Sequence, residues 1–482
     1  DRLRSRGLGD VYKRQILKSK KTMKRKLFIF ICCSLCIALT SCTKYLDVKP
    51  KGKVIPKTAE EFSSILHYWL DDIEKGTDDV IVLSPERTAD LELFAEDLDG
   101  TLASSYGVID LYAGTSINRN QKYYSTLYSA IKDCNIIIGE MEDTESETAK
   151  TLLGTAWSIR SVCYYNLMIR YCEPYQLQTA SETLGLPLVD EFDIEAKPSR
   201  STLKETADFI LKGFQHALSY NSTDKNYIFT APITKAYMAR FFFWTQDWNN
   251  AIIYAKEVLD KYPMLEADEY VNAINQKLEP TKNVIIRSYT NENDVASMGY
   301  LAAQTNVQKR PVCKNLVDLF GNTPNDIRNS GFNTKRITTK VVTTKFRSEE
   351  LCLIIAEAYA HLGKEPEALE YLNLLRSKRI TENYVAYTMD NLPEVFKQNI
   401  TTDATGTPLT KLMSAILCER RKELFLEGDR WFELKRNGRP EFWIAANGKK
   451  YVTEKYLYTF PIPKSDVNLF PGLIIQNPGY IE

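Results

Sequence analysis

Helical hydrophobic periodicity constrains the fold of this chain more than any other feature of its sequence. Thr-x-x-Glu capping boxes, which satisfy free amides at helix N-termini, begin at Thr58, Thr144 and Thr202. The first predicts a helix that runs to Gly76. Three apolar stripes have helical spacing: Tyr124, Leu127, Ile131, Cys134 and Ile138; Leu152, Ala156, Ile159, Cys163 and Leu167; and Leu203, Ala207, Ile210, Phe214 and Leu218. These stripes predict a mainly α-helical core.

A second spacing predicts how helices pair. Alanine, aromatic and alanine residues at offsets of 0, 3 and 12 occur twice, as Ala239, Phe242 and Ala251 and as Ala356, Tyr359 and Ala368. The spacing is tetratricopeptide-like, because small residues there let two antiparallel helices approach closely while the aromatic ring fills the adjoining gap. The predicted fold is therefore mainly α, with tetratricopeptide-like helix pairs forming a scaffold that carries a large irregular, loop-rich insertion.

Composition divides the chain into scaffold and insertions within one domain, residues 42–482. The expected scaffold segments are 58–75, 120–262, 346–379 and 410–436. The segments between them, 76–119, 263–345 and 381–409, are richer in Asn, Thr, Asp, Gly and Pro and lack a sustained helical period. Loops on a rigid scaffold usually carry specificity, so we expect these insertions to bind ligand.

The N-terminal region has the pattern of a bacterial lipoprotein signal. Leu39-Thr40-Ser41-Cys42 ends an apolar run that begins at Leu27 and follows the basic start Met23-Lys24-Arg25-Lys26. The run is too short to span a bilayer comfortably, which disfavours a membrane anchor helix. We interpret residues 23–41 as a signal peptide and Cys42 as the lipidated residue, and we expect residues 1–22 to be upstream read-through.

Composition also excludes several classes of partner. Residues 1–41 contain 11 of the 62 Lys and Arg but 2 of the 62 Asp and Glu, so the chain from Cys42 onward has a formal charge of about −9. An acidic surface offers no footprint for a phosphate backbone, so we expect no nucleic-acid partner. The three histidines are isolated, which predicts no zinc site, and we expect no cofactor. Most of the six cysteines after Cys42 are expected to be free thiols.

The segment from Glu419 to Arg436 carries the densest charge pattern. Its acids Glu419, Glu423 and Glu427 would share one helix face and need cations, which we expect Arg420, Arg421, Arg430 and Arg436 to supply. We favour a structural ion-pair network, because the paired acids of a glycoside hydrolase flank a cleft rather than stack along one helix. The motifs of serine hydrolases, zinc proteases and phosphate loops are also absent from the sequence, so we expect no catalytic residues.

Polar and aromatic residues in the first two insertions are the candidate ligand contacts. They are Tyr106, Tyr112, Arg287, Tyr289, Asn291 and Tyr300, with Asn293 nearby. Aromatic faces stack on the apolar face of a sugar ring, while amide and guanidinium groups hydrogen-bond its hydroxyls. The alternative is that these tyrosines only hold loops onto the core. Asp97-Leu98-Asp99-Gly100 has part of a calcium-loop pattern but is interpreted as a solvated turn.

Several motifs in order resemble the SusD/RagB family of outer-membrane lipoproteins, which serve nutrient uptake in Bacteroidetes. They are Cys42-Thr43-Lys44-Tyr45-Leu46-Asp47 at the mature N-terminus, the helix Ile159 to Leu167, Pro198 to Thr202, Leu316 to Phe320, Ala356-Glu357-Ala358, Glu419 to Arg436, and the ending Phe460-Pro461-Ile462-Pro463 with Gln476 to Tyr480. The resemblance covers nearly all of the mature chain. Departures include Cys163 and Cys172, where the family pattern has a bulkier aromatic and a glycine.

The resemblance implies a helical, lipid-anchored protein of the outer membrane, facing the cell surface. It implies binding of oligosaccharide without catalysis, and action as a hinged lid on a SusC-like TonB-dependent barrel. Ligand can favour a closed lid only if it binds the closed arrangement more tightly than the open one. Two alternatives stay open: a peptide- or protein-binding helical-repeat lipoprotein of an uptake system, and a secreted hydrolase.

The lipoprotein interpretation predicts that Cys42→Ala abolishes acylation. In a host that processes lipoproteins, the wild-type chain should incorporate labelled palmitate and sediment with membranes, whereas the variant should do neither. Ser41→Ala keeps a small residue before the cysteine and should behave as wild type. Equal labelling of the Cys42→Ala variant would contradict the interpretation.

Overall fold

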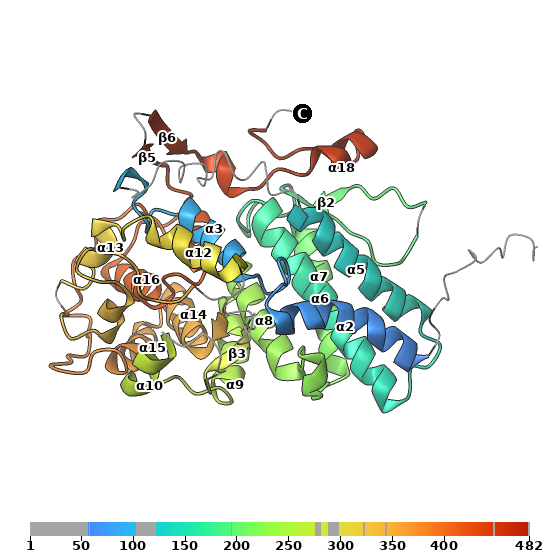
Figure 1. Ribbon diagram of the computed structural model, residues 1–482, viewed down its shortest axis with the longest axis horizontal. Helices are drawn as coiled ribbons and strands as arrows, with labels where there is room; N and C mark the ends of the chain where they lie inside the picture. Colours follow the sequence, from blue (N-terminus) through green and yellow to red (C-terminus); the bar gives the residue numbers. More distant parts are fainter. Residues whose placement is uncertain are drawn as a thin grey trace, which may run out of the picture. The chain divides into compact units, whose positions relative to one another are not determined.

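The computed structural model describes residues 56, 58–102, 122–193, 195–274, 281–287, 298–321, 323–342, 345–446 and 449–480. The chain from Pro56 onward forms a compact unit built mainly of helices (Figure 1), which confirms the predicted fold class. Within the described ranges, no helix has both the length and the apolar character needed to cross a membrane. Cys42 lies outside them.

The first half of the unit runs through α2 (Ala59–Lys75), α3 (Pro85–Phe94), η2 (Gly100–Leu102), α5 (Lys122–Glu140), α6 (Glu147–Tyr171), β1 (Leu184–Pro187), β2 (Arg200–Thr202), α7 (Leu203–Ser219), η5 (Lys225–Tyr227), α8 (Ala231–Trp244) and α9 (Trp248–Leu259). The second half runs through α10 (Ala267–Ile274), β3 (Val284–Arg287), α12 (Met298–Gln308), α13 (Lys314–Asp318), η6 (Ile327–Gly331), β4 (Lys345–Arg347), α14 (Ser348–His361), α15 (Glu365–Ser377), α16 (Lys411–Glu423), α17 (Asp429–Arg436), β5 (Phe442–Ala446), β6 (Lys449–Thr453), η7 (Lys455–Tyr458) and α18 (Lys464–Leu469). The strands form three antiparallel pairs: β1 with β2, β3 with β4, and β5 with β6.

Helix α6 lies at the centre of the first half, with α2, α5 and α7 packed against it (Figure 1). Its predicted stripe is buried, but most of its other faces are buried too, as expected of a helix surrounded by others. The approach of α7 is close at Gly213, where an added Cβ would lie 2.3 Å from Ser161 Oγ. Glycine at this position therefore allows the two helices to meet.

Two of the three predicted capping boxes are present. Thr58 and Thr202 each accept a hydrogen bond from the amide three residues later, and the carboxylates of Glu61 and Glu205 accept one from the backbone N–H of the cap residue. The prediction at Thr144 is wrong, because α6 begins later and Ser146 is its N-cap, accepting from the Ala149 amide at 3.2 Å.

The repeated alanine spacing coincides with two pairs of consecutive helices, α8 with α9 and α14 with α15. All four alanines are completely buried, and α9 also packs against α14, which joins the pairs. In the first pair, the Phe242 ring stacks on Tyr254 with centroids 5.5 Å apart. The buried alanines and the stacked Phe242 ring are in keeping with the predicted spacing, and the tetratricopeptide-like character of the two pairs stays a prediction.

The predicted insertions contain more regular structure than we expected. Helix α3 lies within 76–119, and α10, α12, α13 and β3 lie within 263–345. These helices are 5 to 11 residues long, too short to show a sustained apolar period. Segment 381–409 has turns and an isolated bridge between Thr402 and Pro408 but no helix or strand.

Glu419 and Glu423 of α16 and Glu427 of the segment after it lie in a buried ion-pair network. The prediction that the three share one helix face is wrong for Glu427, because α16 ends at Glu423. Glu423 accepts hydrogen bonds from three guanidinium groups: Arg347 at 2.7 Å, Arg379 at 3.0 Å and Arg328 at 3.3 Å. Glu419 lies 2.6 Å from Arg328 Nη2, and Glu427 lies 2.7 Å from Lys340 Nζ. The predicted network therefore exists and is structural.

Its cations are not the ones we expected. The four arginines of the same segment pair elsewhere: Arg420 with Asp429, Arg421 with Asp97, Arg430 with Glu96 and Glu433, and Arg436 with Glu357. Asp97 is consequently buried, and the interpretation of its segment as a solvated turn is wrong for this residue. All six cysteines after Cys42 are free thiols, as predicted.

The network predicts that Glu423→Gln destabilises the protein by about 3–5 kcal/mol, because three buried guanidinium groups lose their shared carboxylate. Burial alone would raise the pKa of Glu423, but Arg379, Arg347 and Arg328 hold it well below its ordinary value of 4.5. The stabilisation is therefore present above pH 4.5 and is lost as the pH falls further.

Urea denaturation of wild type and variant across this range measures the effect, and the two stabilities should converge in acid. Asp318→Asn is the control, since its ion pair with Lys314 is exposed and should contribute less than about 1 kcal/mol. A Glu423→Gln variant as stable as wild type at pH 7 would contradict the network's role.

Candidate functional site

Most of the predicted ligand contacts lie outside the described residues: Tyr106, Tyr112, Tyr289, Asn291 and Asn293. Tyr300 lies in the first turn of α12, where only the backbone is described. Arg287 is half-buried at the end of β3, opposite Lys345 of β4. The sugar-binding role of these residues remains a prediction.

A surface hollow lies close in sequence to the first insertion. It has a volume of about 190 Å³ and is formed by the end of α2, the loop after it, and the first turns of α3 and α5. We call it the Tyr68 hollow, and its lining residues are Tyr68, Trp69, Asp72, Thr77, Asp78, Asp79, Val80, Arg87, Tyr123 and Thr126.

The aromatic side of the hollow is Tyr68, whose side chain is 64% exposed. Its neighbour Trp69 is buried and donates from Nε1 to Asp133 at 3.1 Å. The two rings meet edge to face, with centroids 5.1 Å apart. The buried indole thus supports an exposed ring that offers a flat face to solvent, which suits stacking on a sugar.

The polar side of the hollow carries Asp79 and Arg87. The Arg87 guanidinium lies 3.4 Å from Asp79 and 3.1 Å from Asp90, and its centre lies 5.5 Å from the centroid of the Tyr123 ring. Burial would lower the pKa of Arg87, but the charges of its neighbours raise it. Arg87 is therefore a fixed cation beside a half-exposed carboxylate, and both can hydrogen-bond hydroxyl groups.

Asp78 holds the loop of residues 78–83, which forms part of the hollow, through hydrogen bonds to its backbone. Its carboxylate accepts hydrogen bonds from four successive backbone amides: Val80 at 3.1 Å, Ile81 at 3.0 Å, Val82 at 2.6 Å and Leu83 at 3.1 Å. Burial raises the pKa of Asp78, although these hydrogen bonds act to lower it. The loop that presents Asp79 therefore has a rigid internal support.

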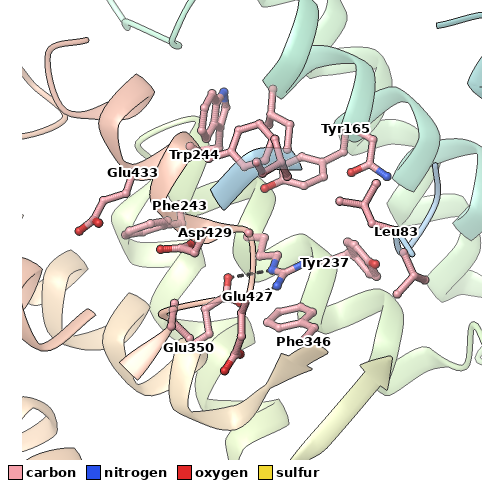
Figure 2. Close-up of a pocket in the computed structure, with 18 of the residues that line it drawn as sticks. Leu83, Tyr165, Tyr237, Phe243, Trp244, Phe346, Glu350, Glu427, Asp429 and Glu433 are labelled. Atoms are coloured by element: carbon pink, nitrogen blue, oxygen red, sulfur yellow. Dashed lines mark hydrogen bonds and ion pairs between the residues drawn. The ribbon is translucent and has the colours of Figure 1, made fainter. Parts of the chain in front are cut away.

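A second hollow lies inside the fold. This interior cavity of about 110 Å³ lies between α6, α8, the β3–β4 pair and the segment that joins α16 to α17. Figure 2 shows Tyr165, Tyr237, Phe346 and Trp244 around it. Glu350 accepts a hydrogen bond from Arg240 Nε at 2.8 Å. Most of the residues that line the cavity belong to the core, and its volume is smaller than that of the Tyr68 hollow. The exposed Tyr68 hollow is the better candidate for a glycan.

The described residues contain no group of three or more His, Cys, Asp or Glu arranged to hold a metal ion. The carboxylates from α16 to α17 are bound to guanidinium or ammonium groups of the core. In the described part of the chain, these acids take part in ion pairs that join elements of the fold.

Two family models match the chain. The model of the SusD family matches residues 290–480, and the model described as "Starch-binding associating with outer membrane" matches residues 44–243. The chain belongs to the SusD/RagB family. A SusD-like protein of Formosa agariphila is 31% identical over 122 residues, which are 25% of this chain and 22% of that protein's length.

Solved structures of the SusD superfamily share the fold. A SusD superfamily protein of Bacteroides vulgatus has a TM-score of 0.68 and 20% identity, covering 89% of this chain and all of that one. A laminarin-binding SusD-like protein has a TM-score of 0.57 and 16% identity, and the match covers 88% of this chain and all of that one. At these identities the likeness establishes the architecture alone.

Sequence reasoning missed the residues of the Tyr68 hollow, although one signal was available. In the predicted helix 58–75, the buried positions are Ala59, Phe62, Leu66, Trp69, Leu70 and Ile73. Tyr68 lies off that stripe, so an amphipathic helix should expose it. The support from Asp78 has no comparable pattern in the sequence.

The loop geometry predicts that Asp78→Asn speeds hydrogen exchange at the amides of residues 80–83 by about tenfold or more, since an amide group cannot accept four hydrogen bonds. Mass-spectrometric exchange on peptides covering the loop measures this. Asp79→Asn changes a half-exposed carboxylate next to it and should leave these amides protected. Unchanged exchange in Asp78→Asn would show that the loop does not depend on the carboxylate.

Proposed function

We propose that this SusD-like protein binds oligosaccharide at the outer membrane and passes it to a SusC-like TonB-dependent barrel. The observation that carries the proposal is the exposed ring of Tyr68 beside the fixed charges of Asp79 and Arg87. One family model is described as starch-binding, and one structural relative binds laminarin, so sugar is the ligand class in keeping with these comparisons.

Each group of the hollow has a distinct role in this proposal. The Tyr68 ring stacks on the apolar face of one sugar unit, which gives affinity without a reacting group. Asp79 accepts hydrogen bonds from hydroxyls and Arg87 donates to ring or hydroxyl oxygens. The hollow is smaller than the roughly 300–1,000 Å³ of an enclosed ligand pocket, which suits a glycan held along an open surface.

The membrane part of the proposal rests on the signal pattern before Cys42 and on the family model that names the outer membrane. Lipid at Cys42 would hold the protein on the cell surface, where the barrel partner would take up the captured glycan. The protein then acts as a lid on the barrel, and glycan that contacts both partners favours the closed arrangement. Binding, without catalysis, is the proposed activity.

The proposal predicts that Tyr68→Ala weakens oligosaccharide binding about tenfold, equivalent to about 1.4 kcal/mol, because the stacking face is lost. Calorimetry against laminarin and starch oligosaccharides measures the affinity. Tyr68→Phe keeps the ring and should retain most of the binding.

Phe192→Ala is the matched control, since Phe192 is an exposed aromatic residue that does not line the hollow. Equal affinity of Tyr68→Ala and wild type would refute the assignment of the hollow. Binding of peptides instead of glycans would favour the helical-repeat adaptor, and release of reducing ends over time would favour a hydrolase.

A further inference from the structure

Charges around the interior cavity are paired with one exception. Four carboxylates line it, and each lies near its own cation: Glu350 with Arg240 at 2.5 Å, Glu427 with Lys340 at 2.7 Å, Asp429 with Arg420 at 2.5 Å, and Glu433 with Arg430 at 2.7 Å. Among the arginines that line the cavity, Arg436 also has a partner, Glu357 at 2.6 Å.

Arg170 is the exception. It lies in the last turn of α6, its side chain is buried with 3% exposure, and no ion pair joins it to a carboxylate within the described part of the chain. Its one side-chain hydrogen bond there runs from Nη1 to the Asn166 carbonyl oxygen at 3.0 Å. A guanidinium group has five N–H donors, so Nε and Nη2 have no partner among the described residues.

The rings near Arg170 do not compensate its charge. Its guanidinium centre lies 5.3 Å from the Phe432 ring and 6.0 Å from the Tyr123 ring, distances at which cation–π attraction is weak compared with an ion pair. Burial lowers the pKa of Arg170, and nearby tyrosines offset this only in part. Burial acts in the same direction on Arg240, but there the charge of Glu350 raises the pKa.

Other donors line the same cavity. Arg240 uses Nε and Nη2 for Glu350, which leaves its Nη1 without a described acceptor. Tyr165 and Tyr237 also line the cavity, and neither hydroxyl makes a hydrogen bond to a described residue. The cavity therefore combines an uncompensated buried cation with O–H and N–H donors, and its volume of about 110 Å³ has room for a small solute with a few waters.

We propose that the interior cavity binds a small monovalent anion, a halide or a carboxylate of one or two carbons, against the guanidinium of Arg170. An anion would supply the missing countercharge and accept the unused N–H donors, and such charge-assisted hydrogen bonds are the strong ones. Water could accept a hydrogen bond but could not compensate the charge of a buried guanidinium. The inference does not depend on glycan binding, since the Tyr68 hollow shares no lining residue with the cavity.

Crystals of the full chain grown without halide or carboxylate, then soaked in sodium bromide, test the site directly. An anomalous bromide peak within about 3.5 Å of the Arg170 guanidinium is expected. Sodium formate soaked with bromide should displace the peak if a carboxylate is the preferred anion, and should leave it if a halide is. Bromide found at the surface alone, an adventitious ion only, or ordinary water in the cavity would overturn the proposal.

Solution measurements test the role of Arg170. At equal ionic strength, bromide or formate should raise Tm above its value in gluconate, which is too bulky for the cavity, and the rise should follow the logarithm of anion concentration. In Arg170→Gln, the apparent anion affinity should fall at least tenfold. Retention of the full response in a folded Arg170→Gln variant would contradict the assignment.

Arg160→Gln is the matched control. Arg160 lies on the same helix, is equally buried, and donates from Nη1 to Asn135 Oδ1 at 2.7 Å and to the Asp190 carbonyl, but it does not line the cavity. This variant should lower Tm in all salts and keep the difference between bromide and gluconate. Should Arg170→Gln fail to fold, the bromide soak of the wild-type crystal still decides the question.

Discussion

The carboxylate of Glu423 is the point on which the packing of the second half of the fold depends. Its three guanidinium partners come from different elements: Arg328 from η6, Arg347 from β4 and Arg379 from the chain after α15. These elements are too small to bury large apolar faces of their own. Buried charges cannot slide past one another as apolar side chains can, so the network specifies where each element meets α16.

The same network fixes one wall of the interior cavity. Glu427 follows the end of α16 and binds Lys340 and Arg347, which holds the turn that leads through Gly428 to α17. Gly428 has a positive φ of 77°, and its amide donates to Glu92 at 2.7 Å. The ion pairs of Glu427 thus determine where Asp429 and Glu433 of α17 lie. The cavity beside Arg170 keeps its shape because the carboxylates that line it are already paired with other cations.

Sequence patterns predicted helix caps and helix pairing well, but they did not predict ion pairs between residues far apart in the sequence. The caps at Thr58 and Thr202 and the buried alanines at 239 and 356 depend on neighbours within one or two helices, which sequence spacing records. Among the cations of the α16 acids, Lys422 is local to Glu419, but the arginines that bind Glu423 lie as far as 95 positions away, and nothing in local spacing marks those. For the same reason the sequence showed that Tyr68 is off the apolar stripe but could not show that Asp79 and Arg87 stand beside it.

Tyr68 and Trp69 illustrate how the fold separates stability from binding on a single helix. Trp69 is buried and hydrogen-bonded to Asp133 of α5, so its loss would disturb the packing of α2. Tyr68 meets that indole edge to face and is 64% exposed, so its replacement leaves the core intact. The rigid indole and the loop held by Asp78 position the exposed ring before any ligand arrives, which lowers the entropy lost on binding. A protein built in this way can change its ligand by exchanging exposed residues of the hollow, while α2 and its contacts with α5 and α6 stay the same.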